Sequence, residues 1–312
     1  MQLHGWIEEQ GHILTPREIE TLTPDRLSRC GGEFLLTTPH LTARDHYGII
    51  PGPIPPGTIR TSAGDLTITP DVPDLPLETA VQEAVRLRTT ENAVVTLSGG
   101  VDSALIAALA RLPCIAVGLP ESHDLLAAEE AADLLDLPLT TCQITDQDIL
   151  EALPRIRAAL PGATRMDLEL ALTGYFIGRT AKTCGAEKIL TGQAADELFA
   201  GYARYSRTAT LRADLDRDFL GLAAQRTRDS TAVGLSGVWY SLPYMDERVV
   251  RASRRLTDTD LISGDQRKLA LRKIAARHLP EKLAWKPKKA MQYGSGITAA
   301  LRRLQKQHNL QL

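Results

Sequence analysis

Apolar and polar residues follow two different patterns along the chain, and the pattern changes near residue 75. Before that point, short β-like runs such as EFLLTT (residues 33–38) and DLTITP (residues 65–70) lie between glycine- and proline-rich turn segments. Such spacing is typical of short strands joined by turns. We therefore predict a small β-rich N-terminal appendage over residues 1–75, with the proline-rich stretch at 70–76 as a linker.

After residue 76, apolar strand-like segments alternate with helix-like segments. The predicted helices cover residues 77–90, 103–112, 127–137 and 172–185, and the predicted strands cover residues 93–97, 114–119, 139–145 and 188–192. This alternation is typical of βαβ units and of a parallel sheet covered on both faces. The predicted fold class is α/β, and the doubly wound parallel sheet belongs to a second domain, residues 76–312. Its C-terminal section is mostly helical from Asp214 onward, with a loop at 286–296.

Composition excludes several classes of function. The 312 residues are 43% hydrophobic and 24% charged, with a formal net charge of -2, so we expect no nucleic-acid partner. No apolar run approaches the ~20 residues of a membrane helix, and the N-terminus lacks the apolar core of a signal peptide. The four cysteines are scattered without a C-x-x-C pair, which argues against a zinc knuckle or disulfide framework and favours a cytoplasmic location.

The segment VVTLSGGVDSALIAALA, residues 94–110, places a glycine–serine loop between a predicted strand and a predicted helix. Ligands of parallel sheets bind beyond the carboxyl ends of the strands, where helix N-termini point N–H groups outward. Glycines let backbone N–H groups approach an anion, and serines add hydroxyl donors, so residues 98–103 predict a phosphate cradle. No lysine follows the glycines, so this is not a Walker loop. Asp102 then makes sense as a Mg²⁺ ligand beside phosphate, although an ordinary strand-to-helix turn remains the alternative.

A second loop, TGQAADELFAGY at residues 191–202, also follows an apolar strand and also carries acids. If the two strands are neighbours, Asp196 faces Asp102 across the same magnesium ion. The alternative, above all for Glu197, is a solvated acidic pair at the start of a helix.

These loops resemble those of a known enzyme family. S-G-G-x-D-S at 98–103 is similar to the motif of the PP-loop ATP pyrophosphatases, and D-E-L-F-x-G-Y at 196–202 narrows the resemblance to the asparagine synthetase and β-lactam synthetase group. Further similar segments lie at 116–135, 242–250 and 267–296, so the resemblance covers about residues 77–300. It implies a PP-loop (adenine nucleotide alpha-hydrolase-like) fold and cleavage of ATP between its α and β phosphates. A carboxylate becomes an acyl-adenylate, and an amine then displaces AMP.

The resemblance also implies roles for individual residues. Asp102 and Asp196 would hold Mg²⁺, and Lys288 would neutralise charge that develops in the transition state. For Lys288, a solvated residue of a basic run is the alternative, and Lys289 is an alternative alignment. The residues expected to contact ATP or pyrophosphate, besides Asp102, are Ser98, Gly99, Gly100, Ser103 and Gly192, together with Thr96, Leu97 and Val117, near which the main chain would meet adenine.

The N-terminal region resembles a shortened glutaminase domain, chiefly at ARDHYGIIP, residues 43–51. Such glutaminases use an N-terminal cysteine whose own α-amino group activates the thiol. This chain opens Met-Gln-Leu-His, and its first cysteine is Cys30. We therefore expect no glutaminase activity, and we expect free ammonia, an amine substrate or a separate amidotransferase subunit to supply the nitrogen.

Three positions depart from the family pattern near the expected substrate pocket. Gln193 stands where the group usually has a glutamate, Trp239 replaces an acid, and Ser241 replaces an arginine. An amide or an indole cannot take a proton from an attacking amine, and the missing arginine removes a bidentate partner for a substrate carboxylate. Gln193 and Trp239 are therefore expected to line a changed pocket, and aspartate is a doubtful substrate. Burial of Trp239 and Tyr240 as core aromatics is the alternative.

The sequence thus predicts an ATP- and Mg²⁺-dependent, AMP-forming carboxylate–amine ligase that acts on a small carboxylic acid. Two alternatives remain open. One is a PP-loop enzyme that modifies tRNA or transfers sulfur, although the basic surface or cysteine pair usual for that class is not seen. The other is a nucleotide-binding partner without turnover.

Overall fold

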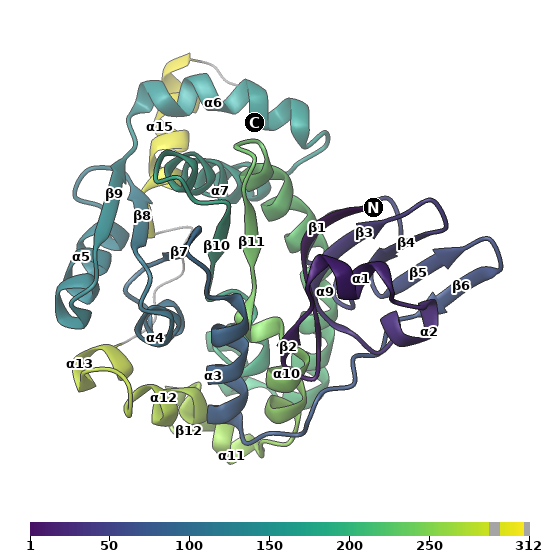
Figure 1. Cartoon of the computed structure of the whole chain (residues 1–312). Helices are drawn as coiled ribbons and strands as arrows, with labels where there is room; N and C mark the ends of the chain where they lie inside the picture. Colours follow the sequence, from purple (N-terminus) through teal and green to yellow (C-terminus); the bar gives the residue numbers. More distant parts are fainter. Residues whose placement is uncertain (287–293, 309–312) are drawn as a thin grey trace.

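A five-stranded parallel sheet forms the centre of the molecule in the computed structural model, which describes residues 1–286 and 294–308 (Figure 1). Its strands are β7 (Ala93–Thr96), β8 (Cys114–Gly118), β9 (Leu139–Gln143), β10 (Lys188–Leu190) and β11 (Trp239–Ser241). The order across the sheet is β11-β10-β7-β8-β9, and every neighbouring pair is parallel. The predicted α/β class and the four predicted strands are confirmed.

Helices cover both faces of this sheet, as the sequence predicts: α6 and α7 lie on one side, and α3 and α4 lie on the other (Figure 1). Between residue 76 and β11 the helices are α3 (Leu77–Arg88), α4 (Val101–Ala110), α5 (His123–Leu135), α6 (Asp146–Ala159), α7 (Arg165–Thr183), α8 (Ala195–Leu198), η1 (Ala203–Arg207) and α9 (Leu211–Gly234). Besides the short helices α8 and η1, two elements of this part differ from the prediction. Helix α6, which contains Pro154, was not predicted, and β11 adds a fifth strand within the section expected to be mostly helical. The residues of β11, Trp-Tyr-Ser, form no aliphatic run of the kind that marks the equally short β10, Lys-Ile-Leu.

The rest of the C-terminal section is mostly helical, as predicted. Its elements are η2 (Pro243–Met245), α10 (Glu247–Arg254), α11 (Asp258–Leu261), the hairpin of β12 (Ile262–Ser263) and β13 (Gln266–Arg267), α12 (Leu269–Ala275), α13 (Glu281–Ala284) and α15 (Ile297–His308). Most of the predicted loop at 286–296 lies outside the described residues.

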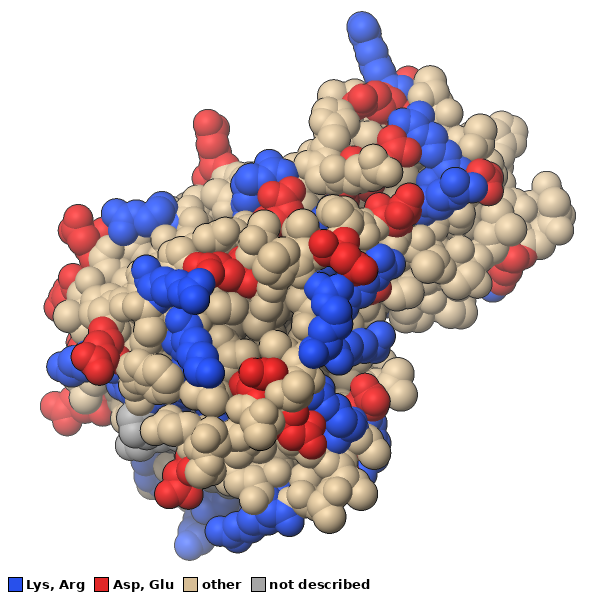
Figure 2. Space-filling model, turned by 90° about the horizontal axis from the view of Figure 1, so that it is seen from below, with Lys and Arg blue, Asp and Glu red and all other residues tan. Residues whose placement is uncertain are grey.

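The surface is mixed in charge on the face that Figure 2 shows, where basic and acidic side chains alternate. Within the described parts of the chain, we find no helix with the length and apolar character that a membrane crossing requires.

The N-terminal residues form a separate six-stranded antiparallel sheet. Its strands are β1 (Gln2–Glu9), β2 (His12–Ile13), β3 (Gly31–Thr37), β4 (Leu41–Arg44), β5 (Thr58–Thr61) and β6 (Gly64–Thr67), in the order β2-β1-β3-β4-β5-β6. Two short helices, α1 (Pro16–Glu20) and α2 (Pro24–Leu27), pack on it and enclose a small apolar core around Ile7, Leu27 and Phe34. The predicted β-rich character is therefore confirmed, and the region has a core of its own.

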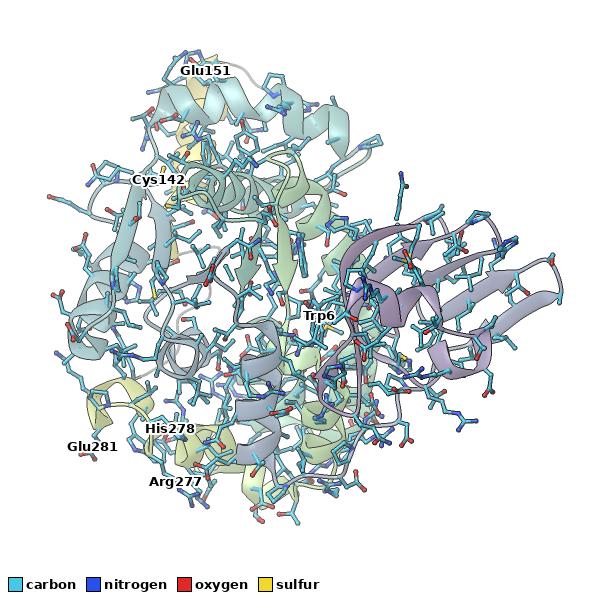
Figure 3. All side chains as sticks on the ribbon, viewed as in Figure 1. Trp6, Cys142, Glu151, Arg277, His278 and Glu281 are labelled. Carbon is cyan, nitrogen blue, oxygen red and sulfur yellow. The ribbon has the colours of Figure 1, made fainter. Side chains whose placement is uncertain are left out.

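Buried charges join this sheet to the parallel sheet. Glu33 on β3 has no exposed surface, and its Oε1 accepts hydrogen bonds from Arg88 Nε at 2.7 Å and from the backbone N–H of Leu242 at 2.8 Å. Its Oε2 accepts from Ser241 Oγ at 2.6 Å and from Trp6 Nε1 at 3.3 Å. Trp6 lies where the two parts of the molecule meet (Figure 3). One carboxylate thus ties β3 to helix α3 and to the carboxyl end of β11.

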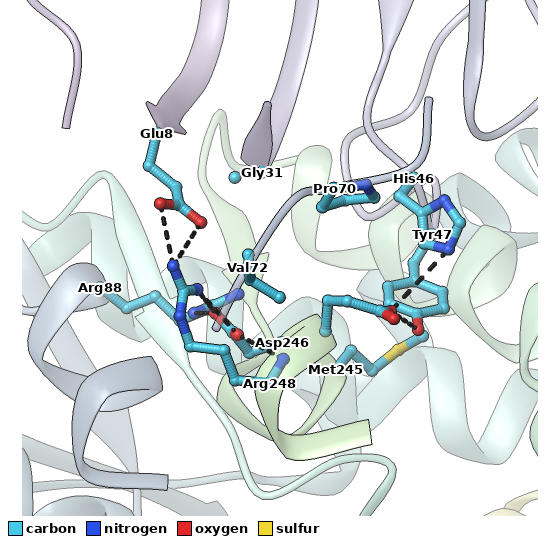
Figure 4. Close-up of a pocket in the computed structure, with 12 residues that line it drawn as sticks. Glu8, Gly31, His46, Tyr47, Pro70, Val72, Arg88, Met245, Asp246 and Arg248 are labelled. Atoms are coloured by element: carbon cyan, nitrogen blue, oxygen red, sulfur yellow. Dashed lines mark hydrogen bonds and ion pairs between the residues drawn. The ribbon is translucent and has the colours of Figure 1, made fainter. Parts of the chain in front are cut away.

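A second buried ion pair extends the same network around a small cavity (Figure 4). Arg248 Nη2 donates to both carboxylate oxygens of Glu8 on β1, at 2.9 and 3.0 Å. Asp246 accepts from Arg88 Nη1 at 2.8 Å and from Arg248 Nη1 at 3.1 Å. These side chains are almost completely buried, so each charge depends on its partners to offset the loss of hydration.

The network gives a stability prediction. Glu33→Ala leaves Arg88 buried without one of its two carboxylates, and we expect the free energy of unfolding to fall by about 3–5 kcal/mol. Equilibrium urea unfolding measures this change. Asp65→Ala is the control, because the pair that Asp65 forms with Arg60 on the same sheet is exposed, and it should leave the unfolding midpoint nearly unchanged. Equal effects of the two substitutions would contradict the role assigned to Glu33.

Candidate nucleotide and metal site

The candidate site lies where the order of the parallel strands reverses. From β7 the chain adds β8 and β9 on one side, and then returns to add β10 and β11 on the other side of β7. Ligands of open α/β sheets bind at such a point, beyond the carboxyl ends of the strands. The two loops singled out in the sequence follow β7 and β10, which are hydrogen-bonded neighbours. The topology therefore brings both loops to one place.

The first loop folds over the start of α4. Gly99 has φ +69°, and a side chain there would overlap the backbone carbonyl of Ala127 on α5, so the position requires glycine. Ser103 Oγ accepts a hydrogen bond from the Ser98 N–H at 3.2 Å and lies 3.1 Å from Ser98 Oγ. The N-cap residue is Gly100, and no side chain caps this helix. Its first N–H groups can therefore face an anion.

The residues expected to meet adenine lie at the same edge of the sheet. Thr96 ends β7, and the N–H of Leu97 donates to Ile115 on β8 at 3.0 Å. Val117 lies near the carboxyl end of β8 and is buried. The structure thus brings these three positions together beside the first loop, and their contact with adenine remains a prediction.

The second loop packs directly on the first. A Cβ atom at Gly192 would lie 2.9 Å from Asp102 Cβ and 3.1 Å from the Ser103 backbone nitrogen. Ala194, which precedes α8, has φ +71°, a left-handed conformation that costs about 1–3 kcal/mol in a residue other than glycine. Asp196 lies in the first turn of α8. The two loops are therefore in contact, and the backbone of the second is strained.

Glu197 is not the solvated acid that the alternative interpretation expected. It is buried, and the hydroxyl of Tyr202 donates to its Oε1 at 2.5 Å. Burial raises the pKa of Glu197 above its usual range, in spite of this hydrogen bond.

Lys268, which the sequence analysis did not assign, joins the two predicted metal ligands. Its Nζ lies 2.5 Å from Asp102 Oδ2 and 2.6 Å from Asp196 Oδ1, and the residue is only 2% exposed. Burial favours the neutral amine, but the two carboxylates outweigh it and raise the pKa of Lys268 above its usual range. The group is therefore a buried ammonium ion. The one signal in the sequence was that Lys268 lies within the segment 267–296, which resembles the family.

Several contacts fix this arrangement. A side chain at Gly201 would overlap both Asp196 and Lys268, and the Gly201 carbonyl accepts from Arg267 Nη1 at 2.7 Å. The hydroxyl of Tyr244, in the 3-10 turn after β11, donates to the backbone carbonyl of Asp102 at 3.0 Å. Glu33 binds the carboxyl end of β11, and the turn that follows this strand contacts the first loop through Tyr244.

The two aspartates fit a magnesium ion that is bound together with phosphate. Both carboxylates converge on the position of one cation, and Asp102 Oδ1 is a buried oxygen for which the described residues provide no hydrogen-bond partner. Within residues 1–286 and 294–308, no cluster of three acidic, histidine or cysteine side chains forms a complete metal site. Mg²⁺ usually takes one or two carboxylates and completes its shell with phosphate oxygens and water. The donor set therefore fits a metal that arrives with a nucleotide.

Lys288 and Lys289 lie outside the described residues, so the predicted role of Lys288 stays a prediction. The described residues on both sides of that segment contact α5 or the turn before it. Lys286 Nζ lies 2.7 Å from Glu130 Oε2, and the Ser295 carbonyl accepts from the N–H of Leu119 at 2.9 Å.

Of the two residues predicted for the substrate pocket, only Gln193 belongs to the loops, as part of the second. Its Nε2 donates to Asp229 Oδ2 on α9 at 2.9 Å. Burial raises the pKa of Asp229, although Arg228 binds its other oxygen at 2.7 Å. The carboxamide of Gln193 is thus anchored through its nitrogen.

Trp239 does not join Gln193. It begins β11, so it lies at the amino end of the strand, whereas the loops lie at the carboxyl ends. Its ring contacts the ring of His4 edge to face at 5.9 Å and the ammonium of Lys188 at 5.7 Å. Ser241 is fully buried against Glu33, and Tyr240 is buried as well. The structure therefore places the side chains of Trp239 and Tyr240 in packing. The Ser241 side chain lies against Glu33, while its carbonyl accepts from the N–H of Thr191, the first residue of the second loop, at 3.2 Å.

Comparison with known proteins gives a family. The family model described as "Asparagine synthase" matches residues 76–237 and 232–310. The chain is 31% identical over 265 residues to the "Putative asparagine synthetase 1" (glutamine-hydrolyzing) of Methanocaldococcus jannaschii, which covers 70% of this chain and 49% of the relative. It is 27% identical over 229 residues to asparagine synthetase B (glutamine-hydrolyzing) of Escherichia coli, with 65% of this chain and 41% of the relative covered. The chain thus spans about half the length, or less, of these curated relatives.

Two solved structures are also similar. One is the NMN synthetase of Francisella tularensis (TM-score 0.29, 15% identity), covering 77% of this chain and 98% of that chain. The other is the NH3-dependent NAD synthetase of Campylobacter jejuni (TM-score 0.30, 14% identity), covering 69% and 95%. These scores are too low to support an argument, and the assignment rests on the family model. The chain belongs to the asparagine synthase family.

Proposed function

We propose that this chain is an ATP-dependent, AMP-forming carboxylate–amine ligase that activates a small carboxylic acid as an acyl-adenylate. The observation that supports this proposal most strongly is the convergence of Asp102 and Asp196 on one cation position, beside the uncapped start of α4. Family membership over residues 76–310 agrees with it.

In the first half-reaction, an oxygen of the substrate carboxylate attacks the α-phosphorus of ATP, and the bond from that phosphorus to the bridging β-phosphate oxygen breaks. Pyrophosphate leaves with the electron pair of that bond. The N–H groups at the start of α4 and the hydroxyls of Ser98 and Ser103 bind pyrophosphate, with Gly192 packed behind them. A magnesium ion held by Asp102 and Asp196 would neutralise charge on the phosphates. Lys288 would add a further positive charge.

In the second half-reaction, a neutral amine or ammonia attacks the acyl carbon, and the bond from that carbon to the AMP oxygen breaks with its electron pair on AMP. The nitrogen loses a proton to solvent water or to the departing AMP. Gln193 belongs to the second loop but cannot accept that proton at its amide. The side chain of Asp229 holds the Gln193 nitrogen, so the amide oxygen of Gln193 remains as a hydrogen-bond acceptor. Gln193 in place of the glutamate usual in this group supports a substrate other than aspartate.

The nitrogen would come from ammonia, an amine or a separate amidotransferase subunit, and we propose no glutaminase activity for this chain. Cys30 is the cysteine of the N-terminal sheet, and it is completely buried in the core of that sheet. Burial raises the pKa of its thiol to about 12, so it is not a thiolate at neutral pH. A nucleophile for glutamine hydrolysis needs the thiolate and access to substrate.

The proposal predicts release of pyrophosphate and AMP when the chain is incubated with ATP, Mg²⁺, ammonium and a suitable member of a panel of carboxylic acids that includes aspartate. Asp102→Asn removes one of the two charges on the metal position, and we expect release to fall at least about 100-fold, or about 2.7 kcal/mol in the barrier. Coupled pyrophosphate detection and chromatography of AMP measure both products.

Asp133→Asn is the matched control, because Asp133 is an exposed aspartate on α5, and it should keep wild-type rates. Formation of ADP and phosphate in place of AMP and pyrophosphate would contradict the proposed cleavage. Equal rates for Asp102→Asn and wild type would contradict the proposed site.

Lys288 gives an independent prediction. Lys288→Ala should lower kcat at least about tenfold, because it removes about 1.4 kcal/mol or more of transition-state stabilisation, and it should change the KM for ATP little. Steady-state kinetics with the best acid separates the two parameters. Lys289→Ala is the matched control and should behave as wild type. A loss confined to Lys289→Ala would assign the role to the neighbouring residue, and two silent variants would refute it for both.

A further inference from the structure

The position that suits a metal ion already holds a cation of the chain itself. Lys268 Nζ contacts one oxygen of each aspartate, at 2.5 and 2.6 Å. A magnesium ion on the same two carboxylates would need metal–oxygen distances of about 2.0–2.1 Å. A magnesium ion on the oxygens that Lys268 contacts would lie only a few ångströms from the ammonium, and two cations so close repel each other. The ammonium of Lys268 and a metal ion therefore compete for the carboxylates.

The placement of Lys268 is built into the fold. The residue precedes α12 with φ +57°, a left-handed conformation that persists in a residue other than glycine only when its surroundings enforce it. Its carbonyl accepts from the N–H of Arg272 at 2.9 Å, and Arg272 in turn donates to the carbonyls of Ala284 at 2.6 Å and Lys286 at 3.0 Å. Gly201 leaves room for the lysine stem, as noted above. The strained backbone and this bracing direct the ammonium at the two aspartates.

Charge decides what can bind there. With Lys268, Asp102 and Asp196 charged, this cluster of one buried lysine and two partly buried aspartates carries a net charge of minus one. A divalent ion added alone would make it plus one, where the aspartate side chains are only 21% and 20% exposed to water. A triphosphate brings up to four negative charges, which give both the metal and the ammonium an anionic partner.

We propose that Lys268 occupies the metal position in the nucleotide-free protein, so that a divalent cation enters only together with the triphosphate. The ammonium then leaves the carboxylates for phosphate oxygens. Lys268 is thus a positioning residue that determines the order of binding. The proposal rests on the proposed function, since it takes the ligand to be ATP.

Binding of Mn²⁺ to the nucleotide-free protein tests this directly, with electron paramagnetic resonance used to count the free ion. Lys268→Met keeps an unbranched side chain, one atom shorter, and removes its charge. We expect Lys268→Met to bind one Mn²⁺ at least about tenfold more tightly than wild type, and a further Asp196→Asn substitution to abolish this gain. Lys273→Met, an exposed lysine on the same helix, is the control and should match wild type.

A second measurement uses the wild-type protein alone. Addition of α,β-methylene-ATP, which cannot be cleaved at the bond in question, should increase its affinity for Mn²⁺ at least about tenfold. Equal Mn²⁺ affinity with and without the analogue, or equal affinity of wild type and Lys268→Met, would overturn the proposal. Neither measurement depends on turnover. A protein that shows this exchange of cations but never releases pyrophosphate would therefore refute the proposed function and leave the role of Lys268 standing.

Discussion

The site depends on a single charge cluster, in which one buried ammonium bridges two partly buried carboxylates from different loops. Asp102 follows β7, Asp196 follows β10, and Lys268 precedes α12, so the cluster joins three distant parts of the sequence. Two of these positions meet because β7 and β10 are neighbours at the point where the strand order reverses. An uncapped helix start lies beside the cluster, and together they supply what a metal-bound triphosphate requires.

Much of the fold could be predicted, because apolar periodicity is a local property of the sequence. Four of the five strands and the helices α3, α4, α5 and α7 were found in this way, whereas α6 was missed and β11 was missed because Trp-Tyr-Ser forms no aliphatic run. The packing of the N-terminal sheet could not be foreseen either. Glu33 is an ordinary surface residue type, and only the tertiary structure shows it buried on Arg88 and holding the end of β11. The N-terminal sheet is therefore tied by buried hydrogen bonds to the carboxyl end of β11 in the parallel sheet.

The candidate site, too, could be predicted from the sequence only in part. Glycine positions such as Gly99 and the acids Asp102 and Asp196 were found because loop chemistry after a strand is visible in sequence. Lys268 was missed because its meaning comes from contacts with residues 72 and 166 positions away. Trp239 was expected near the substrate but lies at the amino end of β11. Its match to a position of the family pattern does not tell which end of a short strand faces the ligand.

The proposed function depends on activation of a carboxylate as an acyl-adenylate at this site. Exchange of labelled pyrophosphate into ATP, measured without ammonium or any amine, reports only this first half-reaction. We expect exchange that requires Mg²⁺ and one particular carboxylic acid, and that disappears in Asp196→Asn. Exchange that persists in Asp196→Asn, or hydrolysis of ATP to ADP without any exchange, would contradict the proposed function.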